Sequence, residues 1–149
     1  MSAKIIPDVV RDQKIHSLAE TGTARDAAKL MAEVHISAVL VAAGDKLLGI
    51  VTERDLTARI VAAGADPDTT PLSEIMTRNP DTLTPGATPL EALEMMRERG
   101  YRHLPLVEDG RMAGMVSIRD LYAAAKAQLE EDVRQREAFI FDTGYGAGT

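Results

Sequence analysis

The chain has 149 residues, of which 45% are hydrophobic, enough for one compact domain with a packed core. It has no Cys, which excludes disulfides, thiolate metal sites and Cys nucleophiles. Its formal net charge of −6 lacks the basic excess that nucleic-acid binding requires. We find no secretory signal and no apolar run of membrane-spanning length. We therefore expect a soluble, cytoplasmic protein that binds neither nucleic acid nor membrane.

In the first half of the chain, hydrophobic and turn patterns predict alternating strands and helices. Thr23, with Asp26 three residues later, is typical of a helix N-cap. Gly44-Asp45 is typical of a hairpin turn. The predicted elements are, in order, a strand over residues 14–18, a helix that begins after Thr23, strands over 37–42 and 46–52, and a helix over 53–63.

The second half repeats this order of elements. Thr88-Pro89-Leu90-Glu91 is a capping box with Pro at the first helical position. Pro105 falls within a predicted strand, and since Pro cannot donate a ladder hydrogen bond, that strand should be irregular or lie at an edge. The predicted elements are a short helix over residues 72–76, a helix from Thr88 to Gly100, strands over 103–107 and 111–117, and a helix that begins at Ile118.

The most informative pattern is an internal repeat. Gly-Ile-Val-Thr-Glu-Arg-Asp-Leu at residues 49–56 returns as Gly-Met-Val-Ser-Ile-Arg-Asp-Leu at residues 114–121, so equivalent residues differ by 65 in number (120 − 55). Such a repeat predicts two like units that face each other across two related clefts. We divide the chain into a first repeat (1–64), a linker (65–71), a second repeat (72–130), and the end of the last helix with the tail (131–149).

The last predicted helix carries a narrow apolar stripe on an otherwise charged surface. Its members are spaced four apart: Leu121, Ala125, Leu129 and Val133. Two interpretations are open, because the stripe could pack against the same chain or against a partner subunit. For the tail over residues 139–149, docking and disorder are both open.

The repeated motif has a chemical interpretation and a structural one. Thr52 and Ser117 are placed as N-caps, and a helix N-terminus suits an anion. Asp55 and Asp120, in the first helical turn, could accept hydrogen bonds from a ribose diol, while the Arg residues before them (Arg54 and Arg119) could bind phosphate. The same Thr/Ser and Asp pattern also describes a plain capping sequence. The occurrence of both copies at one register favours a binding role.

The chain resembles a tandem pair of CBS domains, a unit often called a Bateman module. The resemblance is carried by residues 49–55 and 114–120, by the strands before them (36–41 and 101–107), and by Ile75-Met76-Thr77. It implies an α/β (α+β) fold of two βαββα repeats related by a pseudo-twofold axis. It also implies clefts that bind adenosine-containing ligands, namely AMP, ADP, ATP, S-adenosylmethionine or NAD-type dinucleotides.

Carried over to this chain, the resemblance implies two sites. One would use Thr52, Arg54 and Asp55, and the other Ser117, Arg119 and Asp120. Residues of the opposite repeat would face the base: Ile36 and Ser37 at Asp120, and Tyr101 at Asp55. Arg102 and His103 lie where family members often place phosphate-contacting basic residues. Their first-repeat equivalents, Ser37 and Ala38, are uncharged, so we expect Asp120 to belong to the better nucleotide site.

These features predict a regulatory module, a stand-alone CBS-domain protein that senses adenine nucleotides as an energy sensor without catalysis. No required cofactor, metal site or catalytic residue is expected, because three scattered His without Cys make no metal site and no nucleophile constellation is present. We also expect a homodimer and an effector protein, not yet identified, that responds to it. The alternatives are a dimerising structural subunit with vestigial clefts, or an enzyme of unknown type.

Overall fold

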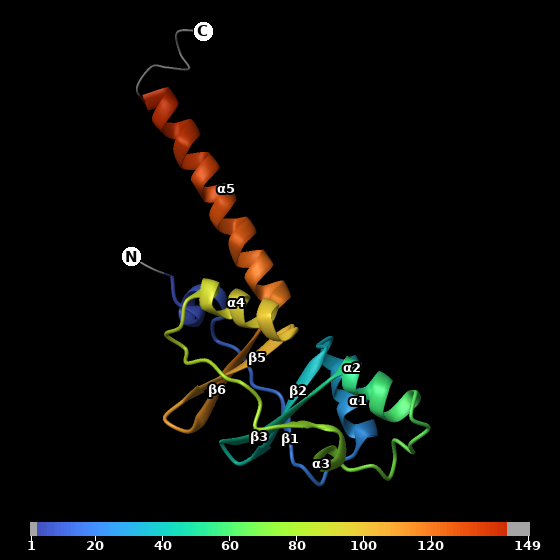
Figure 1. Ribbon diagram of the computed structural model, residues 1–149. Helices are drawn as coiled ribbons and strands as arrows, with labels where there is room; N and C mark the ends of the chain where they lie inside the picture. Colours follow the sequence, from blue (N-terminus) through green and yellow to red (C-terminus); the bar gives the residue numbers. More distant parts are fainter. Residues whose placement is uncertain (1–2, 143–149) are drawn as a thin grey trace.

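The computed structural model describes residues 3–142, with only the backbone described for residues 140–142. Two small sheets, each with its own helices, make up an α/β (α+β) fold, as predicted (Figure 1). In chain order, with η for a π-helical segment, the elements are η1 (Ile5–Val9), β1 (Ser17–Leu18), α1 (Ala24–Val34), β2 (Ala38–Ala43), β3 (Lys46–Thr52), α2 (Glu53–Leu56), η2 (Thr57–Val61), α3 (Leu72–Ile75), β4 (Thr77–Arg78), α4 (Pro89–Arg99), β5 (His103–Glu108), β6 (Arg111–Ser117) and α5 (Ile118–Asp142).

The first sheet has four strands in the order β1-β2-β3-β4. β1 runs parallel to β2, and β3 is antiparallel to both β2 and β4. Alternate residues of a strand point to opposite faces, and one face, with Val39, Val41 and Val51, packs in a core with α1, η2 and α3. The predicted cap of α1 is confirmed, because Thr23 Oγ1 accepts the Asp26 N–H at 3.2 Å.

The second sheet consists of the antiparallel strands β5 and β6. Leu83 adds one parallel bridge to Leu106, just as Leu18 of β1 pairs with Val41 in the first sheet. These two residue pairs are related by the 65-residue offset, so the two units share this strand arrangement. β5 is an edge strand of a two-stranded sheet, and its ladder is interrupted just after Leu106. This confirms the prediction made from Pro105.

A third apolar cluster joins the two units. Leu40 and Ile50, on the face of the first sheet opposite α1, contact Met112 and Met115 of β6. Next to this cluster the Met112 N–H donates to the carbonyl of Asp45 at 2.9 Å, so the two hairpins also touch. The two repeats thus face each other across their sheets, as the internal repeat predicts.

The opening segment of each sequence repeat packs in the unit formed mainly by the other. Ile5 of η1 is fully buried in the second core, and its N–H donates to the Ala87 carbonyl at 2.9 Å. Leu72 of α3 is buried in the first core, and Thr77 of β4 pairs with Ile50 of β3. The two units are therefore interlocked by the chain, and their boundaries in space differ from those of the repeats in sequence.

Gly49 and Gly114, which begin the two motif copies, are buried where these exchanged segments cross the sheets. A Cβ atom on Gly49 would lie 2.6 Å from Met76 Sδ, and one on Gly114 would lie 2.8 Å from Gln13 Oε1. Gln13 also pairs with the backbone of β6: it accepts the Met115 N–H at 2.8 Å and donates to the Met115 carbonyl at 2.9 Å. The motif glycines are therefore needed for close packing.

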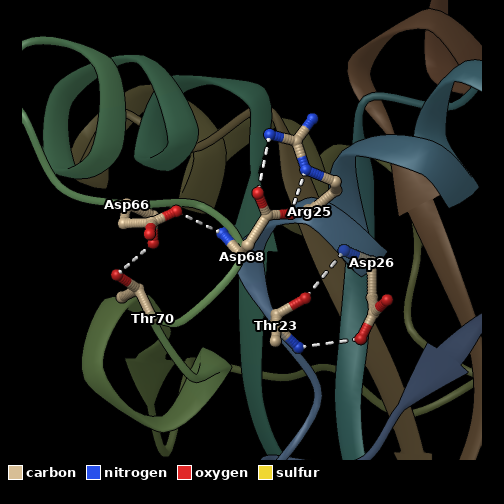
Figure 2. A network of polar contacts seen from close by, with 6 residues as sticks. All are labelled: Thr23, Arg25, Asp26, Asp66, Asp68 and Thr70. Atoms are coloured by element: carbon tan, nitrogen blue, oxygen red, sulfur yellow. Dashed lines mark hydrogen bonds and ion pairs between the residues drawn. The ribbon is translucent and has the colours of Figure 1, made fainter.

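A polar network ties the predicted linker, residues 65–71, to the start of α1 (Figure 2). The Arg25 guanidinium donates to both carboxylate oxygens of Asp68. The Asp68 N–H donates to Asp66 Oδ1 at 2.9 Å, and the Thr70 hydroxyl donates to the Asp66 carbonyl at 2.7 Å. Since these groups are exposed, the network sets the path of the loop and adds little to stability.

Two element predictions need correction. β1 is Ser17–Leu18 and not residues 14–18, because only these two residues pair with β2. The helix predicted over 53–63 ends at Val61, and after α2 it becomes π-helical, with the Ala62 N–H donating to the Thr57 carbonyl at 2.8 Å. Hydrophobic periodicity does not distinguish these hydrogen-bond patterns, and helix ends are the least predictable boundaries.

α5 begins on the second unit and then extends away from both sheets (Figure 1). Leu121 is buried, whereas Leu129 is 66% exposed and Val133 is 53% exposed. Packing against the same chain therefore accounts for the start of the apolar stripe and not for its continuation. Within residues 3–142, no helix has both the length and the apolar content of a membrane span. Most of the predicted tail, residues 143–149, lies outside the described residues.

Candidate functional site

Both copies of the motif form the same capping box at the start of a helix. Asp55 Oδ2 accepts the Thr52 N–H at 2.8 Å, and Thr52 Oγ1 accepts the Asp55 N–H at 3.2 Å. Asp120 Oδ2 accepts the Ser117 N–H at 2.8 Å, and Ser117 Oγ accepts the Asp120 N–H at 3.1 Å. The capping interpretation is thus confirmed. It uses one oxygen of each carboxylate, so it is compatible with a second, ligand-binding role for the other oxygen.

The two carboxylates differ in what surrounds this other oxygen. Asp55 Oδ1 lies 3.9 Å from Arg59 Nε, one helical turn further on, and the Asp55 side chain is 15% exposed. Arg59 is itself anchored, because its Nη1 donates to the Ile75 carbonyl at 2.7 Å. The residue equivalent to Arg59 in the second repeat is Ala124 (59 + 65). Within residues 3–142, no ion pair engages Asp120.

A hydrogen bond between Ser37 Oγ and His103 Nε2, at 2.8 Å, connects the two repeats beside the motifs. The strand starts that carry these residues are tied to the motif helices in the same way in both repeats. The Ser37 carbonyl accepts the Glu53 N–H, and the Arg102 carbonyl accepts the Ile118 N–H, both at 2.9 Å. Movement of either motif helix would therefore displace a strand start and change the Ser37–His103 contact.

His103 lies within the electrostatic reach of both motifs. Burial lowers the pKa of the His103 imidazole, because desolvation disfavours its charged form. The negative charges of Asp120 and Glu53 act in the opposite direction, and the positive charge of Arg102 adds to the lowering. The structure thus joins Ser37 of the first repeat to His103 of the second, and the charge of Asp120 influences the pKa of that imidazole.

The three arginines predicted near phosphate (Arg54, Arg102 and Arg119) are exposed. Within residues 3–142, no hydrogen bond or ion pair engages their guanidinium groups. They are therefore available to an anion approaching the helix starts. Ile36, predicted to face a base, is partly buried against the first core.

Tyr101, predicted to face a base near Asp55, has an engaged hydroxyl. Its Oη donates to Asp81 Oδ2 at 2.9 Å, and Arg99 donates to the same oxygen at 3.2 Å. The hydrogen bond to Asp81 raises the pKa of Tyr101. The ring packs against the second core. A role for Tyr101 beside Asp55 stays a prediction.

Arg59 and Glu53 are relevant residues that the motif did not single out. Arg59 contacts a motif carboxylate, and Glu53 acts on His103 across the repeats. A signal for both was present in the aligned repeats, where Arg59 stands opposite Ala124 and Glu53 opposite Ile118. The shared spacing of the motif draws attention to the positions that agree, whereas these two residues stand where the copies differ in charge.

Two surface hollows are lined by residues outside both motifs. One, of about 480 Å³, lies along α5 and is lined by Asp132, Gln135, Arg136 and Phe139. The other, of about 500 Å³, lies at the turn between β5 and β6 and is lined by Glu108, Asp109, Arg111, Met112 and Ala113. Neither contains a predicted site residue. In the described part of the chain, no group of three or more His, Asp or Glu is arranged to hold a metal ion.

The doubled fold and its two capped motifs agree with a known family. The model of the CBS domain matches residues 7–62 and again residues 72–127. The chain belongs to the CBS-domain family. Among curated relatives, the CBS domain-containing protein CBSCBSPB3 of Arabidopsis thaliana is 36% identical over 130 residues, which cover 87% of this chain. This chain spans only 23% of that plant protein, so the pair corresponds to one part of it.

Solved structures of CBS-domain proteins share the fold. One from Burkholderia ambifaria is 32% identical with a TM-score of 0.79, covering 84% of this chain and 95% of that one. The CBS domain protein PAE2072 of Pyrobaculum aerophilum, solved in complex with AMP, is 29% identical with a TM-score of 0.70. That match covers 76% of this chain and 87% of the relative. The predicted family and the pairing of two repeats are confirmed.

Proposed function

We propose that this CBS pair is a non-catalytic regulatory module that binds an adenosine-containing ligand. The observation that carries the proposal is the set of interactions that the Asp120 carboxylate makes and leaves open. Its carboxylate is held in place by Ser117, and no ion pair within residues 3–142 engages it. Its negative charge acts on His103, which is hydrogen-bonded to Ser37 of the first repeat. The Pyrobaculum relative, which binds AMP, supports the class of ligand.

The chemistry of the groups around Asp120 suits a nucleotide. The available Asp120 oxygen can accept hydrogen bonds from the two ribose hydroxyls. The start of α5 presents the positive end of the helix dipole, which favours a phosphate, although the N–H groups of Ser117, Ile118 and Asp120 are already hydrogen-bonded. Arg119 and Arg102 are exposed nearby in sequence and can supply bidentate donors. AMP, ADP, ATP, NAD and S-adenosylmethionine all carry the adenosine that this arrangement would recognise.

Regulation would follow from the contact between the repeats. A ligand that touches Asp120 and the Ser37–His103 pair would bind two arrangements of the repeats with different affinity, and this difference would shift their populations. A separate effector protein would respond to the shift. No catalytic step is needed in this scheme.

A dimerising structural subunit is the second candidate function. It is favoured by Leu129 and Val133, which are exposed on the part of α5 that leaves the body of the molecule. Such a subunit would associate through α5 whether or not a nucleotide is bound. The two candidates are separated by a binding measurement, because only the first requires a ligand.

Thermal unfolding in the presence of nucleotides tests the proposed function. AMP, ATP or NAD at millimolar concentration should raise the Tm by several degrees, because a ligand at about 100 times its Kd stabilises the native state by about 2.7 kcal/mol. GMP is the matched control and should have a much smaller effect. If no adenosine compound shifts the Tm, the proposed function is wrong. Mass spectrometry of small molecules released from freshly purified protein would identify the ligand.

A further inference from the structure

We propose that Arg59 acts as an internal occupant of the Asp55 site, so that the pair binds one nucleotide per chain and binds it at Asp120. The Asp55 site consists of Thr52, Arg54 and Asp55, and the Asp120 site consists of Ser117, Arg119 and Asp120. The inference rests on the proposed function, since it assigns the ligand to one of two motif copies. It identifies the residue that makes the copies unequal.

The geometry places the Arg59 side chain, which is 47% exposed, within ion-pair distance of the oxygen that a ribose would need. In both sites Oδ2 of the Asp is used by the capping box. In the Asp55 site the remaining oxygen, Oδ1, faces Arg59 Nε at 3.9 Å. A ligand that used Asp55 would have to displace a neighbouring cation and bind a side chain that is only 15% exposed.

Arg59 is held in this position from outside its own helix. Its Nη1 donates to the Ile75 carbonyl at 2.7 Å and also lies 3.4 Å from the Met76 carbonyl. These carbonyls belong to the exchanged opening segment that packs on the first unit. Because the guanidinium is anchored at its far end, it cannot swing away from Asp55 without losing these hydrogen bonds. An unanchored surface arginine would be a much weaker competitor.

The second repeat has no arginine at the position equivalent to Arg59. Ala124 stands one turn after Asp120, where a residue of the same helix face would reach the carboxylate. Val10 stands at the position equivalent to Ile75 (75 − 65). The second unit therefore also receives an exchanged segment, namely the opening segment of the first repeat. Arg59 is therefore a difference between the sites that acts directly on the motif carboxylate. This difference would hold even if Arg102 and His103 contributed nothing to phosphate binding.

Reciprocal substitutions at positions 59 and 124 test the inference with AMP as the probe in isothermal titration calorimetry. The unchanged protein should bind one AMP per chain, and D120N should weaken that binding at least tenfold while D55N leaves it nearly unchanged. Arg59→Ala, which copies the second repeat, should raise the stoichiometry to two. Ala124→Arg, which copies the first, should weaken binding at least tenfold. The double variant should bind one AMP that is now sensitive to D55N.

Several results would overturn the inference. Two equivalent sites in the unchanged protein would refute it and leave the proposed function standing, and so would a stoichiometry that stays at one in Arg59→Ala. A protein that binds no AMP, ATP or NAD would instead refute the proposed function. Arg59→Met, which keeps the aliphatic stem without the guanidinium, provides a second test if Arg59→Ala does not fold. Circular dichroism and a melting curve would establish folding for each variant.

Discussion

Asp55 and Asp120 each use one of their two carboxylate oxygens to cap a helix. The other oxygen of Asp55 lies near Arg59, whereas no ion pair within residues 3–142 engages Asp120. The capping and binding interpretations of the motif are therefore not exclusive alternatives. The residues of the motif could be selected from sequence because their spacing repeats. The unequal surroundings of the two motif copies could not be predicted from sequence, because Arg59 donates to a carbonyl on a segment that comes from the other repeat.

His103 gives a prediction for pH dependence. Burial lowers its pKa in the folded state, so the unfolded chain takes up a proton at higher pH than the native protein does. The stability that depends on neutral His103 is complete above the unfolded pKa near 6.5 and is lost as the pH falls through the lower folded value. His103→Gln, which cannot titrate, should lose less stability over this acidic range.

The measurement is the Tm of both proteins from pH 7.5 to pH 5. The advantage of the unchanged protein over His103→Gln should shrink as the solution becomes more acidic. A difference that is constant or that grows towards low pH would contradict the assigned direction. The same series also tests the Ser37 contact, because Ser37→Ala should lower the Tm at neutral pH and leave the pH trend in place.

At the scale of elements, most strands and helices could be predicted because local signals agree with tertiary packing. The capping boxes at Thr23 and Thr88 are examples. The extent of β1 could not be predicted, because its two residues are strand only through their pairing with β2. The same holds for Gln13, whose amide side chain completes the edge of β6 in a way that no periodicity reveals.

The motif glycines yield a ranked prediction for stability. Gly49→Ala should destabilise the protein by about 1–3 kcal/mol, because the new Cβ would lie 2.8 Å from the backbone carbonyl of Thr77, which cannot easily move. Gly114→Ala should cost less, since the atom it meets is the end of the Gln13 side chain. Gly86→Ala is the control, with no atom within 4 Å, and should stay within about 0.5 kcal/mol.

Urea denaturation of the three variants checks this ranking. The free energy of unfolding should fall most for Gly49→Ala and least for Gly86→Ala. Equal effects at Gly49 and Gly86 would mean that the exchanged segment can move away from the sheet at little cost. That outcome would also weaken the view that the two units are interlocked by close contact.

At the scale of the whole molecule, we expect a homodimer. An isolated helix is marginally stable in water, and the distal part of α5 extends away from the rest of the chain with Leu129 and Val133 exposed. Light scattering should give about twice the 16.1 kDa of one chain. Replacing both side chains with Lys should lower the measured mass towards that of one chain. A single-chain mass for the unchanged protein would contradict this expectation.

The exchange of opening segments has a consequence for how the chain reaches this fold. Leu72 and Ile75 complete the core of one unit, and Ile5 and Val10 complete the core of the other. Neither half of the polypeptide therefore contains all the side chains that its own core requires. Contacts between residues far apart in sequence must form before either core is whole, which slows folding and makes it cooperative. We expect a single unfolding transition by every spectroscopic probe, and a ribosome-bound first half that cannot complete its core until the second half has been synthesised.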